Sequence, residues 1–302
     1  MLAQAVESYL AVRHAAGFAF KSEGSYLRSF ATFSEARGQH YVCSYIAIKW
    51  AGLARSVSQR ARRLGVVIRF ARYIRAEDEG HELPAAVFGR EKLPRPVPYI
   101  LSQDTIRQLV QAASRSGYCT LRRETYSTLF ALLACTGLRV SEAIRLRFED
   151  IVPDGLVIRC SKFRKSRLVP LHETARAGLE RYLERRRSYA PFDDHVFISL
   201  RRKALLLADV ETAFRTAVSQ IGLPRGVGRS RPTPHSLRHA FAIRALQTCP
   251  DDRDRITQHM VALSTYLGHS KVADTYWYLE AVPDLMRDIA DRCESFVTGG
   301  RT

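Results

Sequence analysis

The chain has 302 residues, 46% of them hydrophobic, and its 47 Lys and Arg against 30 Asp and Glu give a formal charge of +17. This length predicts two globular domains, and no apolar run reaches the roughly 20 residues of a membrane span. The N-terminus lacks the pattern of a signal peptide, so we expect a cytoplasmic protein. In a bacterium, we expect it to be associated with the nucleoid.

Positive charge is spread over both halves of the chain. Residues 1–100 hold 15 basic and 8 acidic side chains, and residues 101–302 hold 32 and 22. This excess favours a polyanionic partner, and nucleic acid is the leading candidate. The alternatives are a purely solubilising charge and contact with an anionic membrane, but no lipidation motif or strongly amphipathic basic helix supports a membrane.

The sequence shows no pattern typical of a cofactor site. The six cysteines include no Cys-x-x-Cys pair, and their spacing indicates no zinc site. The chain also lacks the glycine-rich Gly-x-x-x-x-Gly-Lys-Ser/Thr loop that binds nucleotide phosphates. We therefore expect no metal, no ATP and no other cofactor.

Three amphipathic helices are predicted in the first hundred residues. Apolar side chains recur at helical spacing over residues 2–16, 22–37 and 56–75. The third of these helices also carries a stripe of arginines without acidic partners four residues away, which suits a phosphate backbone better than a merely solvated face. The residues predicted to contact DNA are Arg55, Arg60, Arg62, Arg63 and Arg69, together with Lys165 further along the chain.

A proline-rich segment divides the chain. Leu93-Pro94-Arg95-Pro96-Val97-Pro98 has three prolines in five residues, which stop helices and favour extended backbone. We therefore predict a helical domain over residues 1–93, a linker over 94–100 and a second domain over 101–302. The second domain opens at Ser102, a plausible helix N-cap.

The second domain is predicted to be mixed. A nearly apolar helix spans Thr125–Cys135 and ends at Gly137, and a short helix follows over Ser141–Leu146. Residues 156–160 and 167–171 are predicted to form the strands of a hairpin. From Glu173 onward the pattern is mainly helical. The predicted fold class is mainly α with a small antiparallel β-sheet (α+β).

Arg139 is the first candidate for a functional site. It follows the buried helix and precedes the next one, where an unpaired arginine does not easily join a core. Its planar guanidinium suits two oxygens of one phosphate, and Glu142 could orient it. The alternative is a purely structural ion pair between Arg139 and Glu142.

A second candidate lies at the start of a helix that Thr233 caps and Pro234 begins. His235 and Arg238 share one face of that helix, and helix N-termini favour anions. His235 and His239 have the spacing of metal ligands, but Ser236 occupies the position where a zinc-protease helix has glutamate. We expect no metal there.

Two further candidates are less specific on their own. Lys162 lies in the predicted hairpin turn, where a lysine is usually just solvated, although its ammonium group could also reach into a DNA groove and donate a proton. Tyr278 lies nine residues after His269 of the segment Tyr266-Leu267-Gly268-His269-Ser270. Taken alone, a tyrosine in such an aromatic helix is core packing.

Taken in order, these segments resemble the tyrosine recombinase (phage integrase) family over about residues 100–282. Thr136–Glu142 is similar to its first arginine box, Lys162 to its hairpin lysine, and His235-Ser236-Leu237-Arg238 to its His-x-x-Arg box. Leu267-Gly268-His269 resembles its third box, and Tyr278 has the spacing of its nucleophile. The aromatic residues around Tyr278 are similar to those of transposon-encoded members.

The resemblance implies a site-specific recombinase that cuts and rejoins DNA through a 3′-phosphotyrosyl intermediate and a free 5′-hydroxyl. The implied catalytic residues are Arg139, Lys162, His235, Arg238, His269 and Tyr278, with Glu142 in support. Two arginines that bind the non-bridging oxygens would stabilise the negative charge there, as a metal ion does in other enzymes. His235 would take or share the tyrosine proton, Lys162 would protonate the leaving oxygen, and His269 would bind a non-bridging oxygen or the surroundings of the tyrosine.

The resemblance also implies an architecture and partners. The helical first domain is similar to the family's SAM-like core-binding domain and, with the catalytic domain, would form a C-shaped clamp on double-stranded DNA. Four protomers would assemble on two recombination sites, and accessory recombinases or DNA-bending proteins are further candidate partners. A predicted C-terminal helix over residues 284–297 would dock on a neighbouring protomer, or otherwise on its own domain.

Two other functions remain open from the sequence. A type IB topoisomerase would use the same chemistry to relax one duplex. A sequence-specific DNA-binding protein could retain these residues without catalysing anything. Trapping a covalent complex with DNA separates both enzymes from the inactive binder, and assembly on two sites separates the recombinase from the topoisomerase.

Overall fold

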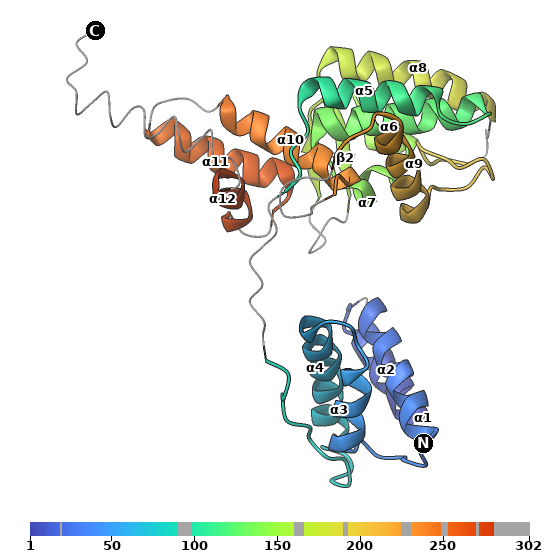
Figure 1. The fold of residues 1–302 in the computed structure, drawn as a ribbon, viewed down its shortest axis with the longest axis vertical. Helices are drawn as coiled ribbons and strands as arrows, with labels where there is room; N and C mark the ends of the chain where they lie inside the picture. The colour runs from blue at the N-terminus through green and yellow to red at the C-terminus, as the bar shows by residue number, and fades with distance from the viewer. Residues whose placement is uncertain are drawn as a thin grey trace. The chain divides into compact units, whose positions relative to one another are not determined.

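The computed structural model describes residues 1–18, 20–89, 98–159, 166–189, 193–224, 231–248, 253–269 and 272–280. The chain folds into two compact units, Met1–Arg95 and Pro96–Thr302. Helices dominate both units, and one small sheet lies in the second (Figure 1). The mainly helical fold class with a small antiparallel sheet is therefore confirmed.

The described part of the first unit contains four helices, α1 (Leu2–Ala15), α2 (Lys21–Glu35), α3 (Ser44–Gly52) and α4 (Val57–Ile74). Their apolar faces enclose one core that includes Leu27, Phe30 and Phe70. Ser56 caps α4 by accepting a hydrogen bond from the backbone N–H of Gln59 at 3.2 Å. The sequence predicts α1, α2 and α4, whereas α3 was not predicted.

The arginines on α4, and Arg55 just before it, differ in their surroundings. Three of the predicted DNA contacts are exposed to solvent, namely Arg55, Arg62 and Arg69. Arg60 is half-buried and donates from Nε to the carbonyl of Ala54 at 2.9 Å. The guanidinium of Arg63, also half-buried, lies 5.4 Å from the ring centroid of Trp50 on α3. Arg60 and Arg63 therefore also serve the packing of this unit.

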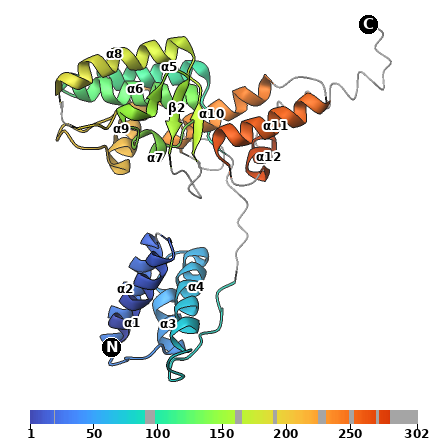
Figure 2. The same ribbon diagram turned by 180° about the vertical axis from the view of Figure 1, so that it is seen from behind.

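The second unit opens with two long helices, followed by short elements and then by helices again. In chain order its elements are α5 (Gln103–Arg115), α6 (Thr120–Thr136), α7 (Val140–Ala143), the 3₁₀ helix η1 (Phe148–Asp150), β1 (Ile151–Val152), β2 (Gly155–Ile158), β3 (Arg167–Val169), α8 (Glu173–Tyr189), α9 (Leu207–Gln220), α10 (Pro234–Gln247), α11 (Arg253–Leu267) and α12 (Ala273–Glu280). Helix α6 packs against α5, α8 and α10, so it forms the centre of the unit (Figure 2).

The sheet has the strand order β1-β2-β3, and both pairs are antiparallel. Ile158 on β2 pairs with Arg167 on β3, so the hairpin predicted from the sequence is present. The predicted turn between these strands, with Lys162 and Lys165, lies outside the described residues. β1 has only two residues, too few to show an alternating pattern, and was not predicted.

Gly137 ends α6 in a left-handed conformation, with φ 62° and ψ 18°, as the sequence predicts. A Cβ atom at this position would lie 2.5 Å from the ring of Phe241 on α10. Glycine therefore permits both the turn and the close approach of α10. The turn brings Arg139 immediately after the buried helix.

Helices α10, α11 and α12 form a second apolar cluster in this unit, separate from the core around α6. The cluster buries Leu246, Leu263 and Leu267, and the ring of Tyr278 on α12 is also part of it. Figures 1 and 2 show the three helices side by side. Within the described ranges, no helix combines the length and apolar character that a membrane crossing requires.

Candidate active site

Three arginines converge on the C-terminal end of α11. Arg167 donates from Nε to the carbonyl of Tyr266 at 2.7 Å, and Arg238 donates from Nη2 to the carbonyl of Leu267 at 2.7 Å. Arg139 donates from Nη2 to the carbonyl of Gly268 at 2.8 Å. The last carbonyls of a helix have no partner within the helix and carry its negative dipole end. Three successive carbonyls therefore hold three cations together.

Gly268 makes this convergence possible. Its φ is +65°, a conformation that glycine adopts without strain. A Cβ atom there would lie 2.8 Å from Nη1 of Arg167 and 3.4 Å from Nη1 of Arg139. A larger residue would therefore both strain the backbone and push on the two guanidinium groups.

Glu142 is buried between two of the arginines. Its carboxylate accepts from Nη1 of Arg139 at 2.8 Å and from Arg167 at 3.1 and 2.9 Å, and it also accepts from the backbone N–H of Arg139 at 3.0 Å. Burial pushes the pKa of Glu142 upward, but the hydrogen bonds and charges of the two arginines outweigh burial and bring it to about 2. Glu142 is therefore ionised at neutral pH.

Arg238 is the most buried of the three arginines, with 1% of its surface exposed. Besides Leu267, it donates from Nη1 to the carbonyl of Gly137 at 2.6 Å, which ties α10 to the end of α6. Burial, and next the positive charge of Arg139, lower its pKa to about 10. Arg238 therefore remains a cation at neutral pH.

Tyr278 packs against two histidines beside this cluster. Only 2% of its surface is exposed, whereas Tyr276 is 48% exposed. The hydroxyl of Tyr278 lies 3.2 Å from Nδ1 of His239, and its ring stacks on that of His269 with 6.2 Å between centroids. Nδ1 of His269 is 2.7 Å from Oγ1 of the buried Thr275, which fixes the orientation of the ring.

His235 lies at the N-terminal turn of α10 and is exposed to solvent. Its ring meets the ring of His239 edge to face, with 4.5 Å between centroids. The turn is held by Ser236, whose hydroxyl accepts from the backbone N–H of Thr233 at 3.1 Å. His235 is thus positioned at the rim of the site, where helix α10 presents its positive dipole end.

The structure brings together most of the predicted site. Those residues are Arg139, Glu142, His235, Arg238, His269 and Tyr278. Lys162 lies outside the described residues. The sequence does not predict two residues of the cluster, because its pattern indicates only the start of a strand at Arg167, and His239 is considered there only as a metal ligand that Ser236 argues against. Their positions follow from tertiary packing rather than from local pattern.

The comparisons with known proteins agree with this geometry. The model of the phage integrase family matches residues 100–283. The chain belongs to the phage integrase family. It is a tyrosine recombinase, an enzyme of site-specific DNA strand exchange.

Similar proteins extend the match beyond the catalytic unit. The protein y4rB of Sinorhizobium fredii is 36% identical over 302 residues, which cover 96% of either chain. Tyrosine recombinase XerD of Proteus mirabilis is 32% identical over 231 residues, 75% of this chain and 69% of XerD. The crystal structure of a lambda integrase tetramer bound to a Holliday junction matches with TM-score 0.60 at 19% identity, over 89% of this chain and 77% of that one.

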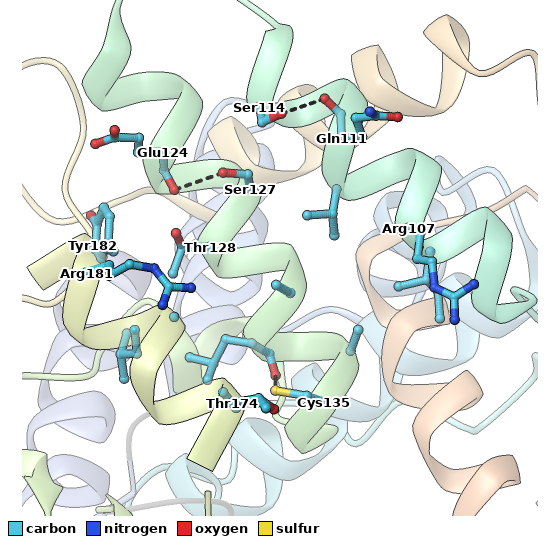
Figure 3. Close-up of a pocket in the computed structure, with 18 of the residues that line it drawn as sticks. Arg107, Gln111, Ser114, Glu124, Ser127, Thr128, Cys135, Thr174, Arg181 and Tyr182 are labelled. Atoms are coloured by element: carbon cyan, nitrogen blue, oxygen red, sulfur yellow. Dashed lines mark hydrogen bonds between the residues drawn. The ribbon is translucent and has the colours of Figure 1, made fainter. Parts of the chain in front are cut away.

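The recombinase also has a groove away from this cluster, with a cavity volume of about 850 Å³. Helices α5, α6 and α8 line it together with Arg244 of α10, and none of the predicted catalytic residues does (Figure 3). Cys135 and Ser127 in its wall donate hydrogen bonds to the carbonyls of Leu132 and Glu124 on their own helix. The chemistry of the enzyme is therefore not expected in this groove.

Among the described residues, one group has the spacing of metal ligands, namely Asp193, Asp194 and His195. The carboxylate of Asp193 accepts from Nη2 of Arg186 at 3.2 Å and from the backbone N–H of His195 at 2.8 Å. Arg186 is completely buried, so this carboxylate balances a buried cation. The group thus has a structural role that requires no metal.

Proposed function

We propose that Tyr278 is the nucleophile that attacks the scissile phosphodiester and forms a 3′-phosphotyrosyl bond. The observation that carries this proposal is the position of its hydroxyl on α12, against His239 and next to the arginine cluster at the end of α11. The positive charge of Arg238 would attract Tyr278 in its deprotonated form, which favours the phenolate. Tyr276, two residues earlier, is exposed and is not proposed to react.

Arg139 and Arg238 are proposed to stabilise the pentacoordinate phosphate. Attack concentrates negative charge on the non-bridging oxygens, and preorganised donors stabilise that charge without reorganisation. Arg139 is 26% exposed and so is accessible to a phosphate, while Arg238 adds a fixed charge behind it. Arg167 and Glu142 hold Arg139 in place. These charges support a reaction that needs neither a metal ion nor ATP.

His235, His269 and Lys162 complete the proposed set. The sequence predicts that His235 takes or shares the tyrosine proton, but the hydroxyl of Tyr278 contacts His239, so His235, exposed at the N-terminal turn of α10, is proposed instead to bind a non-bridging oxygen. His269 is proposed to hold the ring of Tyr278 through their stacking contact. Lys162 is proposed to protonate the leaving 5′-oxygen, because its predicted turn joins β2 to β3, and Arg167 of β3 contacts the site.

The first unit is proposed to act as a core-binding domain on the DNA backbone. The exposed arginines Arg55, Arg62 and Arg69 on or beside α4 support this role, since each neutralised phosphate releases condensed counterions. Replacing these three residues by alanine should weaken binding and flatten its dependence on salt. Replacing Arg60 or Arg63 should also reduce the stability of the unit, because both make contacts within it.

Assembly as a tetramer on two recombination sites is proposed for this recombinase. Its fold matches that of a lambda integrase that crystallised as a tetramer on a Holliday junction. Residues 284–297, which lie outside the described ranges, are proposed to dock on a neighbouring protomer. Their sequence places the apolar residues Leu285, Ile289 and Phe296 among charged ones, a pattern that suits an amphipathic docking helix.

A trapped covalent complex tests the proposed chemistry. The DNA is a site selected from random duplexes by binding to this chain, with a nick just downstream of the cleavage point, so that the short product diffuses away. We expect the upstream strand to remain on the protein after denaturation and the released strand to carry a 5′-hydroxyl, also in the presence of a chelator. Attachment of the downstream strand, or loss of cleavage with the chelator, would contradict the proposal.

A further inference from the structure

His239 occupies a position that the motif spacing does not assign to catalysis. It follows Arg238 on α10, and its Nδ1 lies 3.2 Å from the hydroxyl oxygen of Tyr278 on α12. The two rings meet edge to face, with 5.4 Å between centroids. A separation of 3.2 Å between nitrogen and oxygen is that of a hydrogen bond. His239 therefore touches the atom that is proposed to attack.

Neighbouring rings fix the orientation of His239. The ring of His235 lies 4.5 Å away, nearly perpendicular, and that of Trp277 lies 5.4 Å away. His239 is half-buried, and the hydroxyl of Tyr278 is shielded in a residue that is only 2% exposed. The imidazole is thus held against the phenol by contacts on α10 and α12 rather than by solvent.

Several charged or titratable groups face this pair. His235 and Arg238 belong to the same helix, α10, and His269 follows α11 and stacks on Tyr278. The positive charges of Arg238 and Arg139 act on the same region. Cations near a phenol favour its deprotonated form. A base that accepts the proton must be neutral when the phenol attacks, and imidazole is a side chain that can gain and lose a proton in the physiological range.

We propose that His239 accepts the proton of Tyr278 during strand cleavage, an inference that rests on Tyr278 being the nucleophile. As the bond between Tyr278 Oη and phosphorus forms, the phenolic O–H bond breaks and its proton moves to Nδ1 of neutral His239. The bond between phosphorus and the 5′-oxygen breaks, and this oxygen takes its proton from the proposed acid Lys162. Rejoining reverses both proton transfers and both phosphorus–oxygen bond changes, so every proton, electron and group is accounted for.

The position of His235 fits a different role. It is exposed at the first turn of α10, where a helix N-terminus attracts an anion, and it reaches Tyr278 through the ring of His239. The two histidines, four residues apart, thus have different proposed roles. His235 faces the phosphate and His239 faces the nucleophile.

The test is the rate of covalent complex formation on the nicked substrate between pH 5.5 and 8.5, with DNA saturating. Asparagine in His239→Asn places an amide near the position of Nδ1 and keeps a hydrogen bond, but it cannot accept a proton. We expect the wild-type rate to fall about tenfold per pH unit at the acid end of this range, because protonated His239 cannot act. His239→Asn should be slower by about 10²-fold or more at pH 7.5 and should lack this acid limb.

Matched variants separate His239 from its neighbours. His235→Asn and His269→Asn should be slower at all pH values but should retain the acid limb. Imidazole added to His239→Ala should restore part of the lost rate and should not change that of His235→Ala. Thermal unfolding and DNA binding at neutral pH establish that each variant is folded.

Three outcomes would overturn the inference. One is a His239→Asn variant with an unchanged rate, and another is a slower variant that keeps the wild-type acid limb, which would mean a purely positioning role. The third is a wild-type profile without an acid limb, which does not depend on any variant being folded. If instead the wild-type adduct is not on Tyr278, the proposed function itself fails, and mapping the adducted tyrosine distinguishes the two failures.

Discussion

Arg167 donates hydrogen bonds to both carboxylate oxygens of Glu142, at 3.1 and 2.9 Å. The same carboxylate holds Arg139 through its guanidinium and its backbone N–H. Glu142 is thus a spacer between two cations, each of which also binds the end of α11. The buried carboxylate and the end of α11 together hold Arg139 against the strand β3.

Glu142→Gln should destabilise the catalytic unit, because it leaves two guanidinium groups without their counter-charge. We expect a loss of about 3–5 kcal/mol in the free energy of unfolding at pH 7, measured with urea. The folded pKa of Glu142 is about 2, below its ordinary value of 4.5. Its contribution, about 3 kcal/mol, is therefore fully present above pH 4.5 and is lost as pH falls from 4.5 to 2.

The pH dependence provides the control for this prediction. The stability difference between the wild type and Glu142→Gln should shrink progressively below pH 4.5, since protonation makes the wild-type carboxyl resemble the amide. A difference that stays constant from pH 7 to pH 3 would contradict the ionised, doubly paired Glu142 described above.

Gly268→Ala should impair cleavage more than stability. The backbone at φ +65° costs a residue with a side chain about 1–2 kcal/mol. The added Cβ also pushes on Arg167 and Arg139, and a small displacement of a catalytic group can lower the rate about 10²-fold. We expect a rate loss of that order in the nicked-substrate assay, with DNA binding retained.

Gly222 offers a matched control, since its φ is also +65° but nothing lies within 4 Å of a Cβ atom there. Gly222→Ala should show a similar loss in melting temperature and no loss in cleavage rate. Equal effects of the two substitutions on cleavage would show that the arginine contacts at Gly268 do not matter.

Lys162→Ala should slow strand cleavage, because the leaving 5′-oxygen would lose its proton donor. General acids contribute about 10²–10⁴-fold. A substrate with a 5′-thiol leaving group needs no such donor, so it should restore the rate of Lys162→Ala towards that of the wild type. Lys165→Ala, three residues away, is the control for a general loss of positive charge. Equal slowing on both substrates would exclude Lys162 as the acid.

Deleting residues 284–302 should impair assembly before it impairs DNA binding. The proposed docking segment would be lost, whereas the arginines of α4 and the catalytic cluster would remain. Gel-shift titration should show single-site binding within about threefold of the wild type, a modest change for a surface remote from the contacts. Sedimentation with two-site DNA should show loss of the tetramer. Unchanged assembly would contradict the proposed docking of residues 284–297 on a neighbouring protomer.

Local patterns predicted the parts of this enzyme that local forces determine. The apolar run ending at Gly137 predicted α6 and its left-handed cap, and the two short apolar runs on either side of the basic turn predicted β2 and β3. The order of the boxes predicted Arg139, Arg238 and Tyr278 as one site. Each of these depends on neighbours in sequence or on a family resemblance.

The missed features depend on packing between distant segments. Arg167 precedes a strand, and only the fold shows that its guanidinium reaches Glu142, 25 residues away. His239 meets Tyr278 across 39 residues, between two helices whose contact no periodicity reveals. Helix α3 has nine residues and buries Trp50, but its apolar side chains are too continuous to show one face. The sequence therefore reveals the motifs but not the contacts that orient their side chains.

The proposed reaction depends on which tyrosine attacks the phosphate, and trapping the covalent complex with single tyrosine variants identifies that residue. Wild type, Tyr278→Phe and Tyr276→Phe are incubated with the nicked site, denatured and separated by electrophoresis. We predict that Tyr278→Phe binds the site but forms no adduct, while Tyr276→Phe forms it as the wild type does. An adduct that persists in Tyr278→Phe and disappears in Tyr276→Phe would contradict the account.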